Sequence, residues 1–139
     1  MEQISTLRLT DEEKANLQLL RITDGILIGV TNRDGLTGSL ILPDTITEIG
    51  KKAFSGCTGL TSIAIPDSVT QIGYGAFDGC EKLDNIIIKS ERLTEIGYDA
   101  FSHIKPDARF TVKNESIKAL LQSCGSDIQN GQITVNPNS

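Results

Sequence analysis

The chain has 139 residues, a formal net charge of -5 at pH 7, 38% hydrophobic residues, 4% aromatic residues and no Trp. This length fits one domain that buries about two thirds of its unfolded surface, in a core that must be mainly aliphatic. The acidic balance and the lack of a Lys/Arg run argue against nucleic acid as a partner, and no apolar run approaches the roughly 20 residues that span a bilayer.

The N-terminal region is predicted to contain a short helix. The first residues, MEQISTLRLTDEEK, are polar and acidic and do not resemble a secretory signal. Thr10 followed three residues later by Glu13 forms a capping box, and Asp11, Glu12 and Glu13 would lie at the positive end of the helix dipole. We therefore expect a helix that begins after Thr10.

Residues 22–43, ITDGILIGVTNRDGLTGSLILP, are predicted to form short strands. Asp24-Gly25 and Asp34-Gly35 are turn dipeptides that separate short apolar runs. We expect a hairpin here, which together with the helix makes an N-terminal segment of residues 1–39.

The central region repeats itself. LPDTITEIGKKAFSGC (42–57) and IPDSVTQIGYGAFDGC (65–80) agree at most positions, and a weaker third copy carries one extra residue in KSERLT (89–94), which replaces PDSVT (66–70). Four positions recur at intervals of 23 and 24 residues: Ile49, Ile72 and Ile96; Gly50, Gly73 and Gly97; Ala53, Ala76 and Ala100; and Phe54, Phe77 and Phe101. A period of about 20 to 50 residues is typical of a solenoid, in which each repeat buries its apolar face against its neighbours. Asp44 and Asp67 recur after Pro in a turn, where an Asp carboxylate can bond to nearby backbone N–H groups.

Each repeat contains two predicted strands and a tight turn. Leu-x-x-Ile-x-Ile, at 60–65 and 83–88, alternates its Ile residues onto one face of a strand. Residues 69–72 are predicted to form a shorter strand, with Val69 and Ile72 pointing inward. The glycine that follows each short strand marks a bend in which a Cβ atom or a negative φ would interfere. Ala-Phe-x-x-Cys is interpreted as a helical or 3₁₀ turn, and stacking the repeats predicts an interior ladder of Ile49, Ile72, Ile96, Phe54, Phe77, Phe101, Cys57 and Cys80.

The C-terminal region, residues 108–139, is predicted to form a strand, a helix and a final strand that close the stack. Asn114 can cap a helix that runs to about Cys124, with Gly125 as its stop. One face of this helix is apolar, as an end cap requires, because the open end of a solenoid is otherwise an apolar edge. Asn114-Glu115-Ser116 also matches a glycosylation acceptor, but the capping role explains this Asn equally well.

The pattern LxxIxIPxSVTxIGxxAFxxC resembles the leucine-rich repeat of the BspA type, which is common in bacterial cell-surface proteins and in some protist ones. Leu60 to Cys80 fit almost every signature position, and the resemblance covers residues 40 to about 104. The third copy departs from the pattern, since it lacks Pro-Asp-Ser and has Ile104 where Cys belongs. The resemblance implies one leucine-rich-repeat solenoid domain over residues 1–139, mainly β with turns and 3₁₀ segments and capped by terminal α-helices. About three repeats of 23–24 residues would fill residues 40–107, between the caps at 1–39 and 108–139.

Candidate catalytic and metal-binding residues are few. Cys57 and Cys80 occupy the same repeat position, which would allow a redox pair or a metal site, but free Cys usually behaves as a small buried hydrophobe. A thiol enzyme with Cys124 as nucleophile and His103 as base is a remote hypothesis, because nothing in their spacing supports the pairing. No phosphate-binding loop, His-x-x-His pair or nucleophile elbow occurs. We expect no catalysis, no cofactor and no metal ion.

The remaining candidate site is the outer face of the longer strands. By alternation the outward side chains are Ser39, Ile41, Ser62, Ala64, Asn85, Ile87, Arg109 and Thr111. In repeat proteins the sheet face is often the ligand-binding face, and outward aliphatic residues such as Ile41 and Ile87 often mark partner sites. Strand propensity alone can also select them.

We therefore expect a non-catalytic module that recognises a protein or glycan partner. The resemblance implies cell-surface adhesion or host interaction within a longer secreted chain. The alternative is a scaffold, effector or inhibitor inside the cell. The polar N-terminus and the cysteines, which suggest no disulfide framework and look reduced, favour that alternative, and a full-length chain of this sequence would be cytoplasmic.

Overall fold

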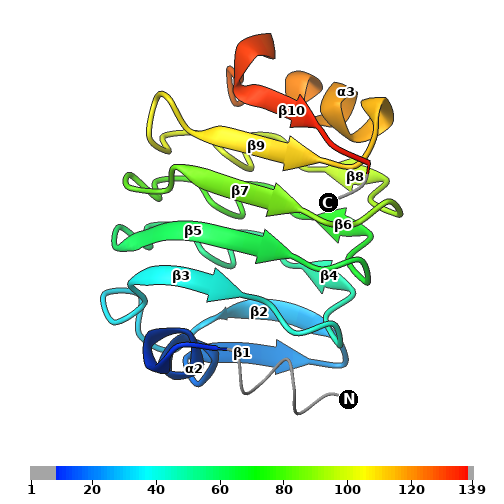
Figure 1. The fold of residues 1–139 in the computed structure, drawn as a ribbon. Helices are drawn as coiled ribbons and strands as arrows, with labels where there is room; N and C mark the ends of the chain where they lie inside the picture. The colour runs from blue at the N-terminus through cyan, green and yellow to red at the C-terminus, as the bar shows by residue number, and fades with distance from the viewer. Residues whose placement is uncertain (1–8, 138–139) are drawn as a thin grey trace.

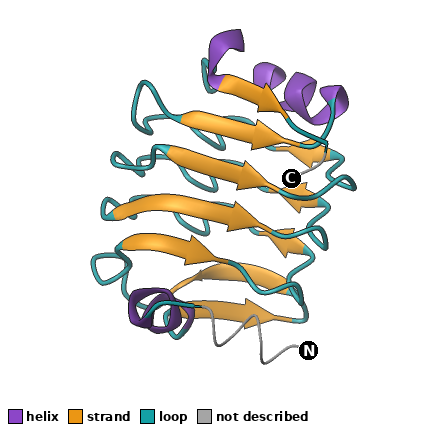
Figure 2. Ribbon diagram, viewed as in Figure 1, coloured by secondary structure: helices purple, strands orange, loops and turns teal. Residues whose placement is uncertain are grey.

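The described part of the chain, residues 9–137 of the computed structural model, is a stack of coils that rises in sequence order from the N-terminal to the C-terminal end (Figure 1). The strands of successive coils form two sheets, and helices lie at the two ends of the stack (Figure 2). Segments 1–8 and 138–139, which include most of the polar stretch that precedes Thr10, lie outside the described residues.

The two sheets have five strands each, in the orders β1-β2-β4-β6-β8 (sheet A) and β10-β9-β7-β5-β3 (sheet B). Sheet A consists of β1 (Leu20–Thr23), β2 (Ile26–Val30), β4 (Glu48–Ile49), β6 (Gln71–Ile72) and β8 (Glu95–Ile96). Sheet B consists of β3 (Gly38–Ile41), β5 (Leu60–Ile65), β7 (Asn85–Ile88), β9 (Arg109–Val112) and β10 (Ile133–Val135). The helices are α2 (Asp11–Leu17), α3 (Glu115–Ser123) and the 3₁₀ helix η1 (Asn130–Gln132). Within the described residues every pairing is parallel except that of β1 with β2, an antiparallel hairpin.

The register follows the repeat. Ile63 pairs with Ile86, and Ile86 pairs with Phe110, so each residue lies beside the equivalent residue of the next coil. The short strand is only two residues long, rather than the four predicted for 69–72. The reason is that the Val69 N–H already donates to Pro66 O within the turn, at 3.2 Å, so Val69 is buried but does not join the sheet.

Three phenylalanines stack through the interior. The rings of Phe54 and Phe77 lie 5.0 Å apart, those of Phe77 and Phe101 lie 5.1 Å apart, and both pairs are nearly parallel. Phe110 of β9 meets Phe101 edge-on at 5.1 Å and ends the stack. The Ala-Phe-x-x-Cys segments are 3₁₀-like turns with bonds to the third residue back, such as Cys57 N–H to Phe54 O at 3.1 Å. The isoleucines and cysteines at the other ladder positions are buried around them.

The recurring glycines are needed for only one of the two expected reasons. Gly50, Gly73 and Gly97 do not have a positive φ, so the expectation that a negative φ would interfere is wrong. A Cβ atom is nevertheless excluded: at Gly73 it would lie 2.7 Å from the Lys51 nitrogen, and at Gly97 it would lie 2.6 Å from the Gly73 carbonyl carbon. Close approach of neighbouring coils therefore requires glycine here.

The N-terminal end of sheet B is covered by α2. The predicted capping box is present, since Thr10 Oγ1 accepts from Glu13 N–H and Glu13 Oε1 accepts from Thr10 N–H. Asn16, which is 2% exposed, supplies the edge strand with hydrogen bonds. Its Nδ2 donates to Thr37 O at 2.8 Å and to Ser39 O at 2.7 Å. One amide side chain thus satisfies backbone groups that a further strand would otherwise pair.

The C-terminal cap has the predicted strand–helix–strand order. Asn114 Oδ1 accepts from Ile117 N–H at 2.9 Å, and α3 ends at Cys124 and a left-handed Gly125 with a φ of 77°. The segment after the helix covers the Ala-Phe turn of the third repeat, because Ser126 Oγ accepts from Phe101 N–H at 3.0 Å.

Candidate binding surface on sheet B

The eight outward residues form two straight rows on sheet B. One row pairs Ser39, Ser62, Asn85 and Arg109, and the other pairs Ile41, Ala64, Ile87 and Thr111. We call these eight residues the outer stripe. β10 extends the second row by Thr134, which pairs with Thr111 and which the sequence analysis did not include. The alternating ITV of residues 133–135 is the signal that could have found it.

The outer stripe consists mainly of small and aliphatic side chains, with Asn85 and Arg109 as its larger polar members. Ile41 is 38% exposed, Asn85 and Arg109 are exposed, and the other members are half-buried by their neighbours in the row. Among the described residues, one hydrogen bond between side chains crosses it, from Asn85 Nδ2 to Ser62 Oγ at 3.5 Å. The parallel strand pairing of sheet B fixes the positions of the two rows, so binding of a ligand would not require this surface to become ordered.

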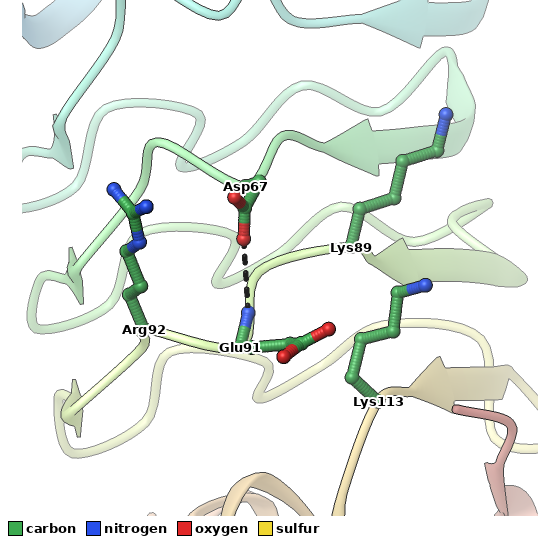
Figure 3. Close-up of a pocket in the computed structure, with 5 residues that line it drawn as sticks. All are labelled: Asp67, Lys89, Glu91, Arg92 and Lys113. Atoms are coloured by element: carbon green, nitrogen blue, oxygen red, sulfur yellow. Dashed lines mark hydrogen bonds between the residues drawn. The ribbon is translucent and has the colours of Figure 1, made fainter. Parts of the chain in front are cut away.

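A charged depression lies at each end of strands β7 and β9, whose outward side chains belong to the outer stripe. At their amino ends, a depression of about 280 Å³ is lined by Asp84, Asn85, Lys105, Asp107 and Arg109, with the Lys105 ammonium 3.5 Å from the Asp84 carboxylate. At their carboxyl ends, a larger one of about 550 Å³ is lined by Asp67, Lys89, Glu91, Arg92 and Lys113 (Figure 3). We call the larger one the basic depression. The sequence analysis missed it, although the irregular KSERLT segment was its signal.

Asp67 illustrates how the coils interlock. Its carboxylate was expected to bond within its own turn, but Asp67 Oδ1 accepts from Glu91 N–H at 3.3 Å, in the next coil (Figure 3). At Asp67 the carboxylate therefore joins two neighbouring coils.

The structure does not bring Cys124 and His103 together. Cys124 is 3% exposed, and its Sγ donates to Leu121 O at 3.1 Å. The His103 side chain is 79% exposed and pairs instead with Asp78, whose Oδ1 lies 2.8 Å from Nδ1. A buried thiol and an exposed imidazole with separate partners do not form a nucleophile and base.

Cys57 and Cys80 lie side by side in the core as free thiols with no exposed surface. Cys80 Sγ donates to Phe54 O at 3.0 Å, and its hydrogen bond with Cys57, together with burial, raises the pKa of the Cys80 thiol. A buried, protonated thiol is a poor nucleophile and a poor metal ligand. Within residues 9–137, no group of three His, Cys, Asp or Glu side chains is arranged to hold a metal ion.

The Asp78 carboxylate controls the protonation of His103. Its hydrogen bond and its negative charge raise the pKa of the imidazole above the ordinary value of 6.5. Because the folded-state pKa is the higher one, this pair stabilises the fold below the unfolded-state pKa. The contribution disappears as the pH rises through the folded-state value.

We therefore expect Asp78→Asn to lower the pKa of His103 toward 6.5. His103 is the one histidine of the chain, so a single imidazole signal in an NMR titration reports this pKa without ambiguity. Asp44→Asn, in an exposed turn of another coil, is the control and should leave the titration unchanged. Equal values in the wild type and in Asp78→Asn would show that the pair does not form in solution.

The comparisons with known proteins fit this geometry. The family model described as the BspA type leucine rich repeat region, with six copies of the repeat, matches residues 34–136. The chain belongs to the BspA-type leucine-rich repeat family. The match extends beyond the 40–104 of the sequence analysis into the C-terminal cap, where β9 and β10 continue the register of sheet B.

The repeat fold is shared with a solved structure. This BspA-type chain is similar to a leucine-rich repeat protein of T. pallidum, known from a crystal structure, with 26% identity and a TM-score of 0.54. The match covers 78% of this chain and 56% of that chain. No curated protein matches the sequence.

The predicted family and solenoid fold are thus confirmed, and BspA-type repeats are, in general terms, protein-interaction modules without catalytic activity. Among residues 9–137, no helix has the length and apolar character needed to cross a membrane.

Proposed function

We propose that this chain is a non-catalytic recognition module that binds a protein partner across the outer stripe. The observation that carries the proposal is the alignment of small and aliphatic side chains in two rows over four coils, with Ile41 exposed at one end. An ordered, partly apolar sheet face suits an extended contact with another protein.

Cell-surface adhesion or host interaction is the setting we propose for this binding. The support is the resemblance of the repeats to those common in bacterial surface proteins, which is an argument from the fold family and not from the site. The three free thiols also fit a partner inside the cell, so the intracellular scaffold or effector is the second candidate. Labelling of intact cells with a membrane-impermeant reagent separates the two, because only a surface protein reacts.

The binding face is tested by the double variant Ile41→Glu, Ile87→Glu. Two carboxylates in the aliphatic row should reduce recovery of a discrete partner at least about tenfold, since the residues that dominate an interface contribute about 2 kcal/mol or more each. The measurement is quantitative mass spectrometry of proteins captured by the immobilised wild type and variant.

The matched control is Ile22→Glu, Ile28→Glu, on sheet A. These residues are 41% and 45% exposed, compared with 38% for Ile41 and a half-buried Ile87, so the same substitution is made at somewhat more exposed aliphatic positions outside the outer stripe. Both variants should keep the circular dichroism spectrum of the wild type. Equal loss of partner in the two double variants would place the binding site away from sheet B.

A further inference from the structure

The basic depression lies where the sequence leaves the repeat pattern. Lys89 and Lys113 occupy the position two residues beyond Ile87 and Thr111 of the outer stripe, and they are neighbours in adjacent coils. The two preceding coils have Pro43 and Pro66 at this position. Pro at this position is therefore replaced by Lys in the two coils that follow, and both lysines line the depression.

The extra residue of the third coil also enters here. Ser90 is fully buried, and its Oγ donates to Val69 O at 2.6 Å. Ser68 makes the equivalent bond to Ile46 O in the coil before, also at 2.6 Å. The structural role of the serine is thus retained, and the additional chain length forms a charged loop directly after it. The Arg92 N–H donates to Ser90 Oγ at 3.0 Å, which anchors this loop to the core.

The charges of the depression are incompletely paired within the described chain. Neither the Lys89 ammonium nor the Arg92 guanidinium forms a salt bridge with any residue in 9–137. Of the two carboxylates present, that of Asp67 already accepts the Glu91 N–H. Lys89 and Arg92 therefore carry positive charges that no salt bridge within residues 9–137 neutralises, in a chain whose net charge is -5.

We propose that the basic depression receives the carboxylate side chains of an acidic peptide segment whose aliphatic residues lie on the outer stripe. The proposal rests on the binding function proposed above and adds the chemistry of the partner. A strand advances about 3.3 Å per residue, so an extended peptide that contacts Ile87 reaches Lys89 within about 7 Å. The planar guanidinium of Arg92 suits a carboxylate, and the aliphatic row suits Val or Leu side chains, which an anionic glycan lacks.

The probes are synthetic ten-residue peptides in which Asp or Glu residues accompany Val or Leu, each with a partner peptide carrying Asn or Gln instead. Binding of labelled peptides to the whole chain is measured by fluorescence anisotropy. The best acidic peptide should bind at least about tenfold more tightly than its amide partner at 50 mM NaCl, and 500 mM NaCl should remove most of that difference because salt screens exposed charges.

Four variants locate the effect. Lys89→Gln and Arg92→Gln should each weaken binding of the acidic peptide about fivefold, since each removes one charge-assisted contact. Glu91→Gln should strengthen it about threefold, because a repelling carboxylate is removed, and damage to the fold cannot mimic a gain in affinity. Lys82→Gln, at an exposed turn before β7, is the matched control and should change the affinity less than about twofold.

Three results would overturn the inference: no preference for the acidic peptides, equal affinity in the wild type and the Lys89 and Arg92 variants, or tighter binding of a heparin fragment than of every peptide with loss in the same variants. The third result would assign the depression to a sulfated glycan. In each case the proposed function is judged separately, since the Ile41→Glu, Ile87→Glu variant tests the stripe with the natural partner.

Discussion

Phe77→Ala is expected to lower the free energy of unfolding by about 3 to 5 kcal/mol, the usual cost of truncating a fully buried Phe. Phe77 has no exposed surface, and its ring is held between Phe54 on one side and Phe101 on the other. Truncation removes contacts with both neighbouring coils at once. The surrounding backbone cannot close the cavity easily, because the Phe77 N–H donates to Ala100 O at 2.7 Å.

The measurement is urea denaturation followed by circular dichroism. The wild type and the variant are compared with the same dependence of the unfolding free energy on urea concentration. Tyr98→Ala is the control, since the exposed fraction of Tyr98, 63%, is the highest among the large hydrophobic residues in 9–137, and its loss should remain below about 1 kcal/mol. A loss below about 1 kcal/mol for Phe77→Ala would contradict the stacked core.

Gly97→Ala is expected to destabilise the protein by about 3 kcal/mol or more, the upper range for inserting a methyl group where none fits. The added Cβ would lie 2.6 Å from the Gly73 carbonyl carbon and 2.7 Å from the Tyr74 Cα. Both atoms belong to the backbone of the preceding coil, so no side-chain rotation relieves the overlap. The coils must move apart instead, which strains the hydrogen bond from Gly97 N–H to Ile72 O at 2.7 Å.

Gly131→Ala is the matched control, because a Cβ at this position has no heavy atom within 4 Å and the φ is not positive. Its free energy of unfolding should stay within about 0.5 kcal/mol of the wild type or rise slightly, as alanine restricts the unfolded chain. Equal thermal midpoints for Gly97→Ala and Gly131→Ala would show that the coils are packed less closely than described.

Much of the fold could be predicted because the repeat is periodic. A residue such as Ile63 pairs with Ile86 one repeat away, so residues that recur in the sequence become neighbours in space. The two rows of the outer stripe follow from the same rule together with the alternation of a strand. The helix caps could also be predicted from the sequence, because the side chains of Thr10 and Asn114 accept hydrogen bonds from residues only three positions further along the chain.

The basic depression could not be predicted in the same way. Its residues come from three coils, with Asp67 and Lys113 at its two extremes, and only the third coil carries the inserted residue. The bond between Asp67 and Glu91 and the pair of His103 with Asp78 likewise join different coils, and in each case at least one partner lies at a position that does not repeat. No local sequence pattern indicates that Asn16 is buried against the edge strand β3, because its hydrogen-bond partners lie more than 20 residues away.

By itself, then, the sequence determined the family, the stacking register, the buried ladder through Phe77 and the location of the outer stripe. These depend on a short pattern that each coil satisfies against its immediate neighbours. The tertiary structure alone decided which irregular side chains meet, such as Lys89 with Arg92 around one depression, and why Gly97 must lack a Cβ. Those features depend on the distance between coils and on the path of the loops, which no periodic pattern specifies.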